Sequence, residues 1–225
     1  MLKYPSIKNL YKLDPETDYT RYDATQYARP EFGMLGSILW GMTEKIDGMN
    51  LRIIREADED YPGSGIIKHR LKFKARTDKG RIPVFMEDRL AELFTLEKFA
   101  GAFDHDSPVC LYGEGYGAGI GKGGKYIADG VDFALFDVKV GDLWLQREDV
   151  ADIAAKMNLT LAPYLGHTTL SMARVLVSRG FSTALPFAST DCMAEGVVLR
   201  PVVELFDRRG HRIIAKLKTE YFGKK

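Results

Sequence analysis

The sequence of 225 residues contains few cysteines and no long apolar run. Its two cysteines, Cys110 and Cys192, lie far apart, and neither has a histidine or another cysteine at the spacing of metal ligands. This argues against a structural zinc site and favours two small, buried apolar residues. No apolar stretch approaches the ~20 residues that a membrane helix needs. The first residues also lack the apolar core of a secretory signal, so we expect a cytoplasmic protein.

A strong charge bias is also missing. The sequence has 32 lysines and arginines and 31 aspartates and glutamates, which gives a formal net charge of +1. Nucleic-acid-binding proteins usually carry a basic excess, so the total charge does not indicate that class. The tail alone is locally basic, through Arg208, Arg209, His211, Arg212, Lys216, Lys218, Lys224 and Lys225. For Lys224 and Lys225 we favour a solvated, frayed terminus.

The periodicity of apolar residues predicts both strands and helices. Alternation predicts strands at Leu51–Arg55, Ile66–Ala75, Val109–Tyr112, Phe133–Val140, Val197–Val202 and Arg212–Leu217. Helical spacing appears at Met86–Phe94, Val150–Met157 and Leu170–Val177, the last followed by Gly180 as a C-terminal cap. Because strands and helices do not alternate regularly, we predict one α+β domain over residues 1–225, with antiparallel sheets. The polar stretch 58–65 is expected to be a hairpin loop.

Gly119–Gly124 matches the glycine spacing of a dinucleotide-binding fingerprint, and Gly121-Lys122 resembles part of a P-loop. The context fits neither motif. The run leads into a strand rather than a helix, and Gly123 stands where a P-loop needs serine or threonine. We interpret this run as a flexible surface loop that exposes Lys122 and Lys125.

Lys45-Ile46-Asp47-Gly48 places a lysine beside a carboxylate and a glycine turn. By itself this string is typical of a surface turn between a short helix and the strand that starts at Leu51. A lysine nucleophile also needs neighbouring cations, burial or a metal to favour its neutral amine. Lys216 and Lys218 alternate along one strand, so both would project from the same face and could supply that charge while holding a triphosphate. The alternative is an exposed edge strand protected by lysines.

Two glutamates flanked by glycine are candidate partners. Glu114 is expected to end one strand and Glu195 to begin another. Neighbouring glycines allow backbone or ligand to approach closely, and such carboxylates suit a hydroxyl group or a hydrated magnesium ion.

Five segments then occur in a familiar order. They are Lys45-Ile46-Asp47-Gly48, Tyr112-Gly113-Glu114, Phe133-Ala134-Leu135-Phe136-Asp137, Glu195-Gly196-Val197-Val198 and Lys216-Leu217-Lys218. In this order they resemble motifs I, III, IIIa, IV and V of the covalent nucleotidyltransferase superfamily, which comprises DNA ligases, RNA ligases and mRNA capping enzymes. The resemblance spans nearly the whole chain. It implies a nucleotidyltransferase fold, ATP-grasp-like, with helices flanking antiparallel sheets around a nucleotide cleft.

Within the superfamily the sequence is most similar to the RNA ligase 2 branch. DNA ligases typically carry arginine five places after the nucleophile, where this chain has Asn50. The opening Tyr4–Asn9 and the closing Ala215–Phe222 also resemble this branch.

The resemblance implies a role for each matched residue. Lys45 would form the adenylyl phosphoramide, and Glu44 would help to define the adenine pocket. Asn50 and Arg76 would contact phosphate or the nucleic-acid end, and Glu114 would bind the ribose. Phe136 would stack on adenine, with Phe133 as the competing candidate. Glu195 would be the main metal carboxylate, and Lys216 and Lys218 would grip the α-phosphate.

The implied activity is that of an ATP-dependent RNA ligase in RNA repair, with ATP and Mg²⁺ or Mn²⁺ as cofactors. Lysyl-AMP would pass its AMP to a 5′-phosphate, which a 3′-hydroxyl would then attack, so the partners are RNA ends or a nicked duplex. We expect an adenylyltransferase domain without a C-terminal OB or helical domain. The basic face of this domain, or a partner chain, would take the place of the missing domain. A minimal ATP-dependent DNA ligase and a non-catalytic module that binds nucleic-acid ends are the alternatives, with a capping guanylyltransferase ranked below them.

Overall fold

The computed structural model describes residues 3–58, 68–189 and 191–223. The chain divides into two compact units. Unit 1 comprises Met1–Tyr4 and Asp47–Ala162, and unit 2 comprises Pro5–Ile46 and Pro163–Lys225. The chain therefore crosses between the units three times. Most of the predicted hairpin loop, together with Ile66, Lys224 and Lys225, lies outside the described residues.

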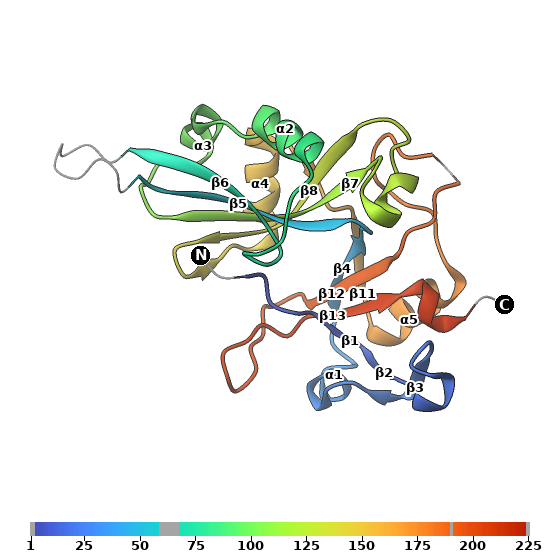
Figure 1. Ribbon diagram of the computed structural model, residues 1–225. Helices are drawn as coiled ribbons and strands as arrows, with labels where there is room; N and C mark the ends of the chain where they lie inside the picture. The colour runs from blue at the N-terminus through green and yellow to red at the C-terminus, as the bar shows by residue number, and fades with distance from the viewer. Residues whose placement is uncertain (1–2, 59–67, 190, 224–225) are drawn as a thin grey trace. The chain divides into compact units, whose positions relative to one another are not determined.

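Unit 1 is built on a sheet with the strand order β10-β8-β7-β5-β6, and β9 pairs with β8. Figure 1 labels β5, β6, β7 and β8 of this sheet. The strands are β5 (Met49–Ala57), β6 (His69–Ala75), β7 (Val109–Gly117), β8 (Val131–Val140), β9 (Leu143–Trp144) and β10 (Thr160–Leu161). All pairs are antiparallel except β10 with β8. A short 3₁₀ helix, η2 (Gly121–Lys125), lies between β7 and β8.

Three helices supply apolar side chains to the core of unit 1: α2 (Val84–Leu93), α3 (Leu96–Ala102) and α4 (Arg147–Met157). From the sheet, alternate residues such as Leu51, Ile53 and Leu111 belong to the same core. Each fully buried side chain of this size contributes about 1.5–3 kcal/mol to stability. Helices α2 and α4 confirm the predicted periodicity. Helix α3 was not predicted because it is short, although Thr95 caps it by accepting a hydrogen bond from the Lys98 N–H at 3.3 Å.

Unit 2 contains a sheet with the strand order β1-β13-β12-β4-β11 and a separate β2-β3 pair (Figure 1). The strands are β1 (Lys8–Asn9), β2 (Tyr11–Leu13), β3 (Tyr22–Tyr27), β4 (Trp40–Lys45), β11 (Tyr164–Thr168), β12 (Gly196–Pro201) and β13 (Ala215–Lys218). Pairing is antiparallel apart from β1 with β13. The remaining elements are η1 (Pro15–Thr17), α1 (Pro30–Met34), α5 (Leu170–Arg179) and η3 (Thr219–Phe222).

Helix α5 packs on one face of this sheet. Its buried residues Leu170, Ala173 and Val177 share a core with residues from β4, β12 and β13. Thr169 caps the helix at its start by accepting a hydrogen bond from the Met172 N–H at 3.4 Å. Gly180 caps its end, as predicted, with φ of 74°.

Several local predictions need correction. Lys45 is the last residue of a strand, β4, and does not follow a short helix. Glu114 lies inside β7, which continues to Gly117 because the alternation persists through glycines that the apolar pattern does not register. The last strand begins at Ala215 rather than Arg212, whose backbone forms one isolated bridge with Phe206.

The glycine run 119–124 contains much of η2, so it is more ordered than the predicted loop. Lys122 and Lys125 are exposed, as expected, whereas Gly123 is buried. A Cβ atom at Gly123 would lie 2.7 Å from the Asp47 carbonyl oxygen. The glycine therefore permits a close approach of two backbone segments.

Both cysteines are buried, as predicted. Burial raises the pKa of the Cys110 thiol to about 11. Within the part of the chain that the structure describes, no helix is both long and apolar enough to span a membrane.

Candidate functional site

Unit 2 brings together three of the residues predicted from the sequence. Glu195 Oε2 accepts from Lys45 Nζ at 2.5 Å, and Glu195 Oε1 pairs with Lys218 Nζ at 2.7 Å. The Glu195 side chain is 9% exposed, whereas those of Lys45 and Lys218 are 23% and 21% exposed. One nearly buried carboxylate is therefore shared by two partly accessible ammonium groups.

Strand register explains why these residues meet. Gly196 lies opposite Lys45 on β4 and opposite Lys218 on β13, so β12 is the middle strand of the three. A Cβ atom at Gly196 would lie 2.0 Å from the Leu217 carbonyl oxygen. Glycine is therefore required at this position for the close approach of β13.

Alternation along β13 places Lys216 and Lys218 on one face, as predicted, while Ala215 and Leu217 enter the core. The edge-strand alternative for these lysines is wrong, because β13 pairs with β1 on one side and β12 on the other. Val198 on β12 pairs with Lys216 on β13 and lies on the same side of the sheet.

Lys218 contacts other groups in addition to Glu195. Its ammonium also contacts Glu220 Oε1 at 3.0 Å and lies 5.7 Å from the centre of the Tyr221 ring. Burial lowers the pKa of Lys218, but Glu195 and Glu220 more than offset this effect and raise that pKa above its ordinary value. Its backbone N–H donates to the Tyr22 hydroxyl at 3.1 Å. Two carboxylates and a backbone hydrogen bond thus hold Lys218 in place as a cation.

Glu44 lies on the core side of β4 and is 2% exposed. Its carboxylate accepts hydrogen bonds from Thr183 Oγ1 at 2.5 Å and from the Ala184 N–H at 2.8 Å. Glu44 therefore anchors the segment after α5 to β4, while the neighbouring Lys45 lies on the opposite face. The sequence carries no local signal for this pairing, because 139 residues separate Glu44 from Thr183.

In unit 1, two other predicted residues are cross-strand neighbours, since Asn50 on β5 pairs with Glu114 on β7. Both lie on the sheet face opposite the helical core, because the adjacent Leu51 belongs to that core. The Asn50 Oδ1 atom is buried and has no hydrogen-bond partner among the residues that the structure describes. A buried polar atom of this kind is suited to a bound donor.

Both candidate aromatic rings lie on β8, one of them at a bulge. Tyr112 pairs with Asp137 and the next residue, Gly113, pairs with Leu135, so Phe136 is the extra residue. Phe133 is fully buried in the core and packs edge-to-face with Phe94 at 5.2 Å between ring centres. Phe136 is half-buried.

Tyr4 is an aromatic neighbour of Phe136 that the sequence reading did not include among the site residues. The two rings pack edge-to-face with 5.0 Å between their centres. The Tyr4 hydroxyl donates to Asp137 Oδ2 at 2.8 Å in a buried hydrogen bond. The N-terminal segment therefore supports the Phe136 ring, a relation that the sequence separation of 133 residues conceals.

Arg76 is exposed and directly follows β6. Arg52 is 1% exposed and contacts the segment on both sides of Arg76. Its Nε donates to the Ala75 carbonyl oxygen at 3.0 Å, and its guanidinium pairs with Asp78 at 2.7 Å. The hydrogen bond from Arg52 lowers the pKa of Asp78. Arg52 thus positions the turn that carries Arg76, and its place on an apolar strand is the signal that could have identified it.

The fold is a mixed α+β arrangement whose two main sheets are largely antiparallel. Residues 39–218 match the family model described as RNA ligase. This match covers most of the chain, and the protein belongs to the RNA ligase family.

Solved structures of Naegleria gruberi RNA ligase share this fold. A variant with ATP and Mn has a TM-score of 0.63 at 16% identity, over 95% of this chain and 59% of that one. The protein with PPi gives 0.60 at 17% identity, over 95% and 59%. A variant with AMP and Mn gives 0.58 at 14% identity, over 97% and 58%. This chain thus spans about three-fifths of their length. No curated protein matched at a significant level.

Proposed function

We propose that the protein is an ATP-dependent RNA ligase whose adenylyltransferase domain uses Lys45 as its nucleophile. The observation that carries this proposal is the shared contact of Glu195 with Lys45 and Lys218. A nucleophilic amine, a carboxylate beside it and a second cation for phosphate are the groups that nucleotidyl transfer requires. Family membership and the ATP-bound relative support the choice of nucleotide.

In the first step, the Lys45 Nζ lone pair attacks the α-phosphorus of ATP. A P–N bond forms, the bond to the bridging oxygen breaks, and pyrophosphate leaves. The amine must be neutral, and Glu195 is a proton acceptor 2.5 Å away. Lys218 would keep its proton and, with Lys216, stabilise charge that develops on the α-phosphate oxygens.

The donor set fits a divalent metal carried on the triphosphate. The described residues contain no group of three or more His, Cys, Asp or Glu side chains that could hold a metal ion by themselves. Mg²⁺ commonly binds through one or two carboxylates together with substrate phosphates, and Glu195 would supply such a carboxylate. When bound, Mg²⁺ or Mn²⁺ would offset negative charge on the phosphate oxygens.

The remaining residues would recognise the nucleotide and the nucleic-acid end. Glu114 would bind the ribose, and the half-buried Phe136 is a better candidate than Phe133 for stacking on adenine. Asn50 and Arg76 would contact phosphate or the nucleic-acid end. Glu44 would shape the adenine pocket through the Thr183–Ala184 segment that it holds.

In the later steps, AMP would pass to the 5′-phosphate of an RNA strand, with release of the lysine. A 3′-hydroxyl would then attack that phosphate, so that a phosphodiester bond forms and AMP leaves. This sequence replaces a poor leaving group with a good one.

The first step can be tested by incubating the protein with labelled ATP and magnesium. We expect a covalent label and an intact mass increased by one adenylyl group, and we expect Lys45→Ala and Lys45→Arg to abolish both. Lys122→Ala, at an exposed lysine outside this set, should label like the wild type. A wild-type protein that takes no label from any nucleotide would contradict the proposal.

A further inference from the structure

The loop between β12 and β13, residues 202–214, is organised around one carboxylate. Asp207 accepts hydrogen bonds from the backbone N–H groups of Arg209 at 2.8 Å and His211 at 2.9 Å. The His211 ring lies 3.3 Å from the same carboxylate. Gly210 makes the turn possible with φ of 76°. The loop is therefore preorganised rather than held only by its ends.

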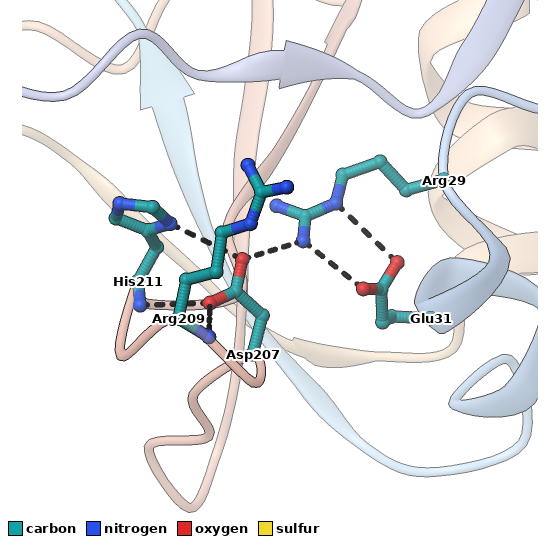
Figure 2. A network of polar contacts seen from close by, with 5 residues as sticks. All are labelled: Arg29, Glu31, Asp207, Arg209 and His211. Atoms are coloured by element: carbon teal, nitrogen blue, oxygen red, sulfur yellow. Dashed lines mark hydrogen bonds and ion pairs between the residues drawn. The ribbon is translucent and has the colours of Figure 1, made fainter.

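A residue distant in sequence fixes this loop to the rest of unit 2. Arg29, just before α1, donates to Asp207 at 2.8 Å and pairs with Glu31 at 3.1 Å (Figure 2). The His211 backbone and then Arg29 lower the pKa of the Asp207 carboxyl well below its ordinary value. Asp207 is 8% exposed as a side chain, and Arg29 balances its charge.

The loop nevertheless presents positive charge to solvent. Its other acid, Glu204, pairs with Arg212 at 3.3 Å, and the Arg212 side chain is 4% exposed. Arg208 and Arg209 are both exposed, and neither guanidinium has an acceptor among the described residues. Figure 2 shows that the Arg209 backbone, and not its guanidinium, joins Asp207.

Exposed apolar side chains lie in the same loop. Phe206 is 55% exposed, immediately before Asp207, and Val203 is 73% exposed. Exposed arginines bind phosphates, and an exposed aromatic ring can stack on a base. We propose that the β12–β13 loop binds the RNA substrate through its phosphate backbone, at a distance from the joined ends. This inference rests on the proposed function.

The position of the loop determines which part of the substrate it would contact. Strand β12 begins at Gly196, opposite Lys45 and Lys218, and ends at Pro201, where the loop starts. At about 3.3 Å per residue, this strand separates the two regions by roughly 17 Å. An RNA duplex is A-form, with a rise of ~2.8 Å for each base pair, so that distance corresponds to about six base pairs. The loop would therefore touch a duplex arm only when the arm exceeds about six base pairs.

The test uses nicked RNA duplexes whose two arms are shortened one at a time. Binding to the full-length protein is measured by fluorescence anisotropy at several salt concentrations. We expect Arg208→Glu with Arg209→Glu to bind long-armed substrates at least about tenfold more weakly and to lower the salt slope by up to about two. On a substrate with arms of about four base pairs, the variant and the wild type should bind alike.

A control with the same charge change is Lys156→Glu with Arg179→Glu, at exposed residues on α4 and α5. It should bind RNA like the wild type. Equal weakening on short and long arms, or no weakening, would overturn the proposal. A changed oligomeric state in sedimentation with unchanged RNA affinity would also overturn it, in favour of a protein interface.

Labelling with ATP separates this proposal from the proposed function. The loop variant should form lysyl-AMP at the wild-type rate, because none of its altered residues belongs to the Lys45 site. If the wild type forms no lysyl-AMP but shows the arm-length effect, the ligase assignment fails and the RNA contact stands. If labelling is normal and the effect is missing, the RNA contact fails alone.

Discussion

At the scale of single residues, carboxylates with several donors organise unit 2. Glu195 is shared by Lys45 and Lys218, Glu44 holds Thr183, and Asp207 holds its own loop and Arg29. A nearly buried carboxylate is costly unless donors surround it, and each of these has at least two. Removing one carboxylate would therefore leave unpaired donors in each place.

The pH dependence of stability provides a test for Asp207. Its folded-state pKa lies below the ordinary carboxyl value near ~3.9, so its stabilising effect is fully present above about pH 4 and is lost as the pH falls below that value. We expect Asp207→Asn to lower the melting temperature at about pH 7 and about pH 5, and the difference to narrow by about pH 3. Asp88→Asn, at an exposed carboxylate on α2, is the control and should change little. A difference that is constant with pH would contradict this account.

At the scale of secondary-structure elements, strand register decides which lysines meet. Lys45 and Lys218 come from β4 and β13, which flank β12 at Gly196. A shift of one residue in either strand would send its lysine to the core face. The catalytic proposal therefore depends on this register.

Gly196→Ala tests the close packing of β12 and β13. The new Cβ would lie 2.0 Å from the Leu217 carbonyl oxygen and 2.8 Å from the Lys218 Cα atom. We expect β13 to shift, with a loss of about 1–3 kcal/mol in unfolding free energy and a large loss of lysyl-AMP formation. Chemical denaturation and ATP labelling measure the two effects.

The matched control is Gly101→Ala in α3, where an added Cβ would meet nothing within 4 Å. This change should stabilise the protein by about 0.5–1 kcal/mol, because alanine favours the helix. If Gly196→Ala were equally harmless, tight packing at Gly196 could not explain how the lysines are held.

At the scale of the whole molecule, the predicted residues divide between the two units. Unit 2 contains Lys45, Glu195, Lys216 and Lys218, which are assigned to phosphate chemistry. Unit 1 contains Asn50, Arg76, Glu114 and Phe136, which are assigned to the nucleoside or the nucleic-acid end. The chain leaves unit 2 after Ile46, so the Lys45–Gly48 segment itself connects the units.

The preference for RNA over DNA tests the proposed function at the scale of the whole protein and its substrate. We expect nicks with RNA at the 3′-hydroxyl side to be sealed faster than all-DNA nicks of the same sequence. Sealing is measured by gel electrophoresis of a labelled strand, and Lys45→Ala serves as the inactive control. Equal rates on the two substrates would favour the alternative of a minimal DNA ligase.

The sequence by itself determined the principal elements and the order of the motifs. Helices α2, α4 and α5 and the central strands followed from apolar periodicity, because each buries one face against a core. Lys216 and Lys218 could be placed on one face for the same reason. Short elements such as α3 were not predicted, because a few residues carry too little periodicity.

Only the tertiary structure decided which distant residues meet. It paired Glu44 with Thr183, Tyr4 with Asp137 and Arg29 with Asp207, each across more than a hundred residues. It also showed that Phe133 is buried in the core, whereas Phe136, the extra residue of a bulge in β8, is half-buried. Local patterns specify the faces of strands and helices, whereas register, bulges and long-range hydrogen bonds depend on how those elements pack.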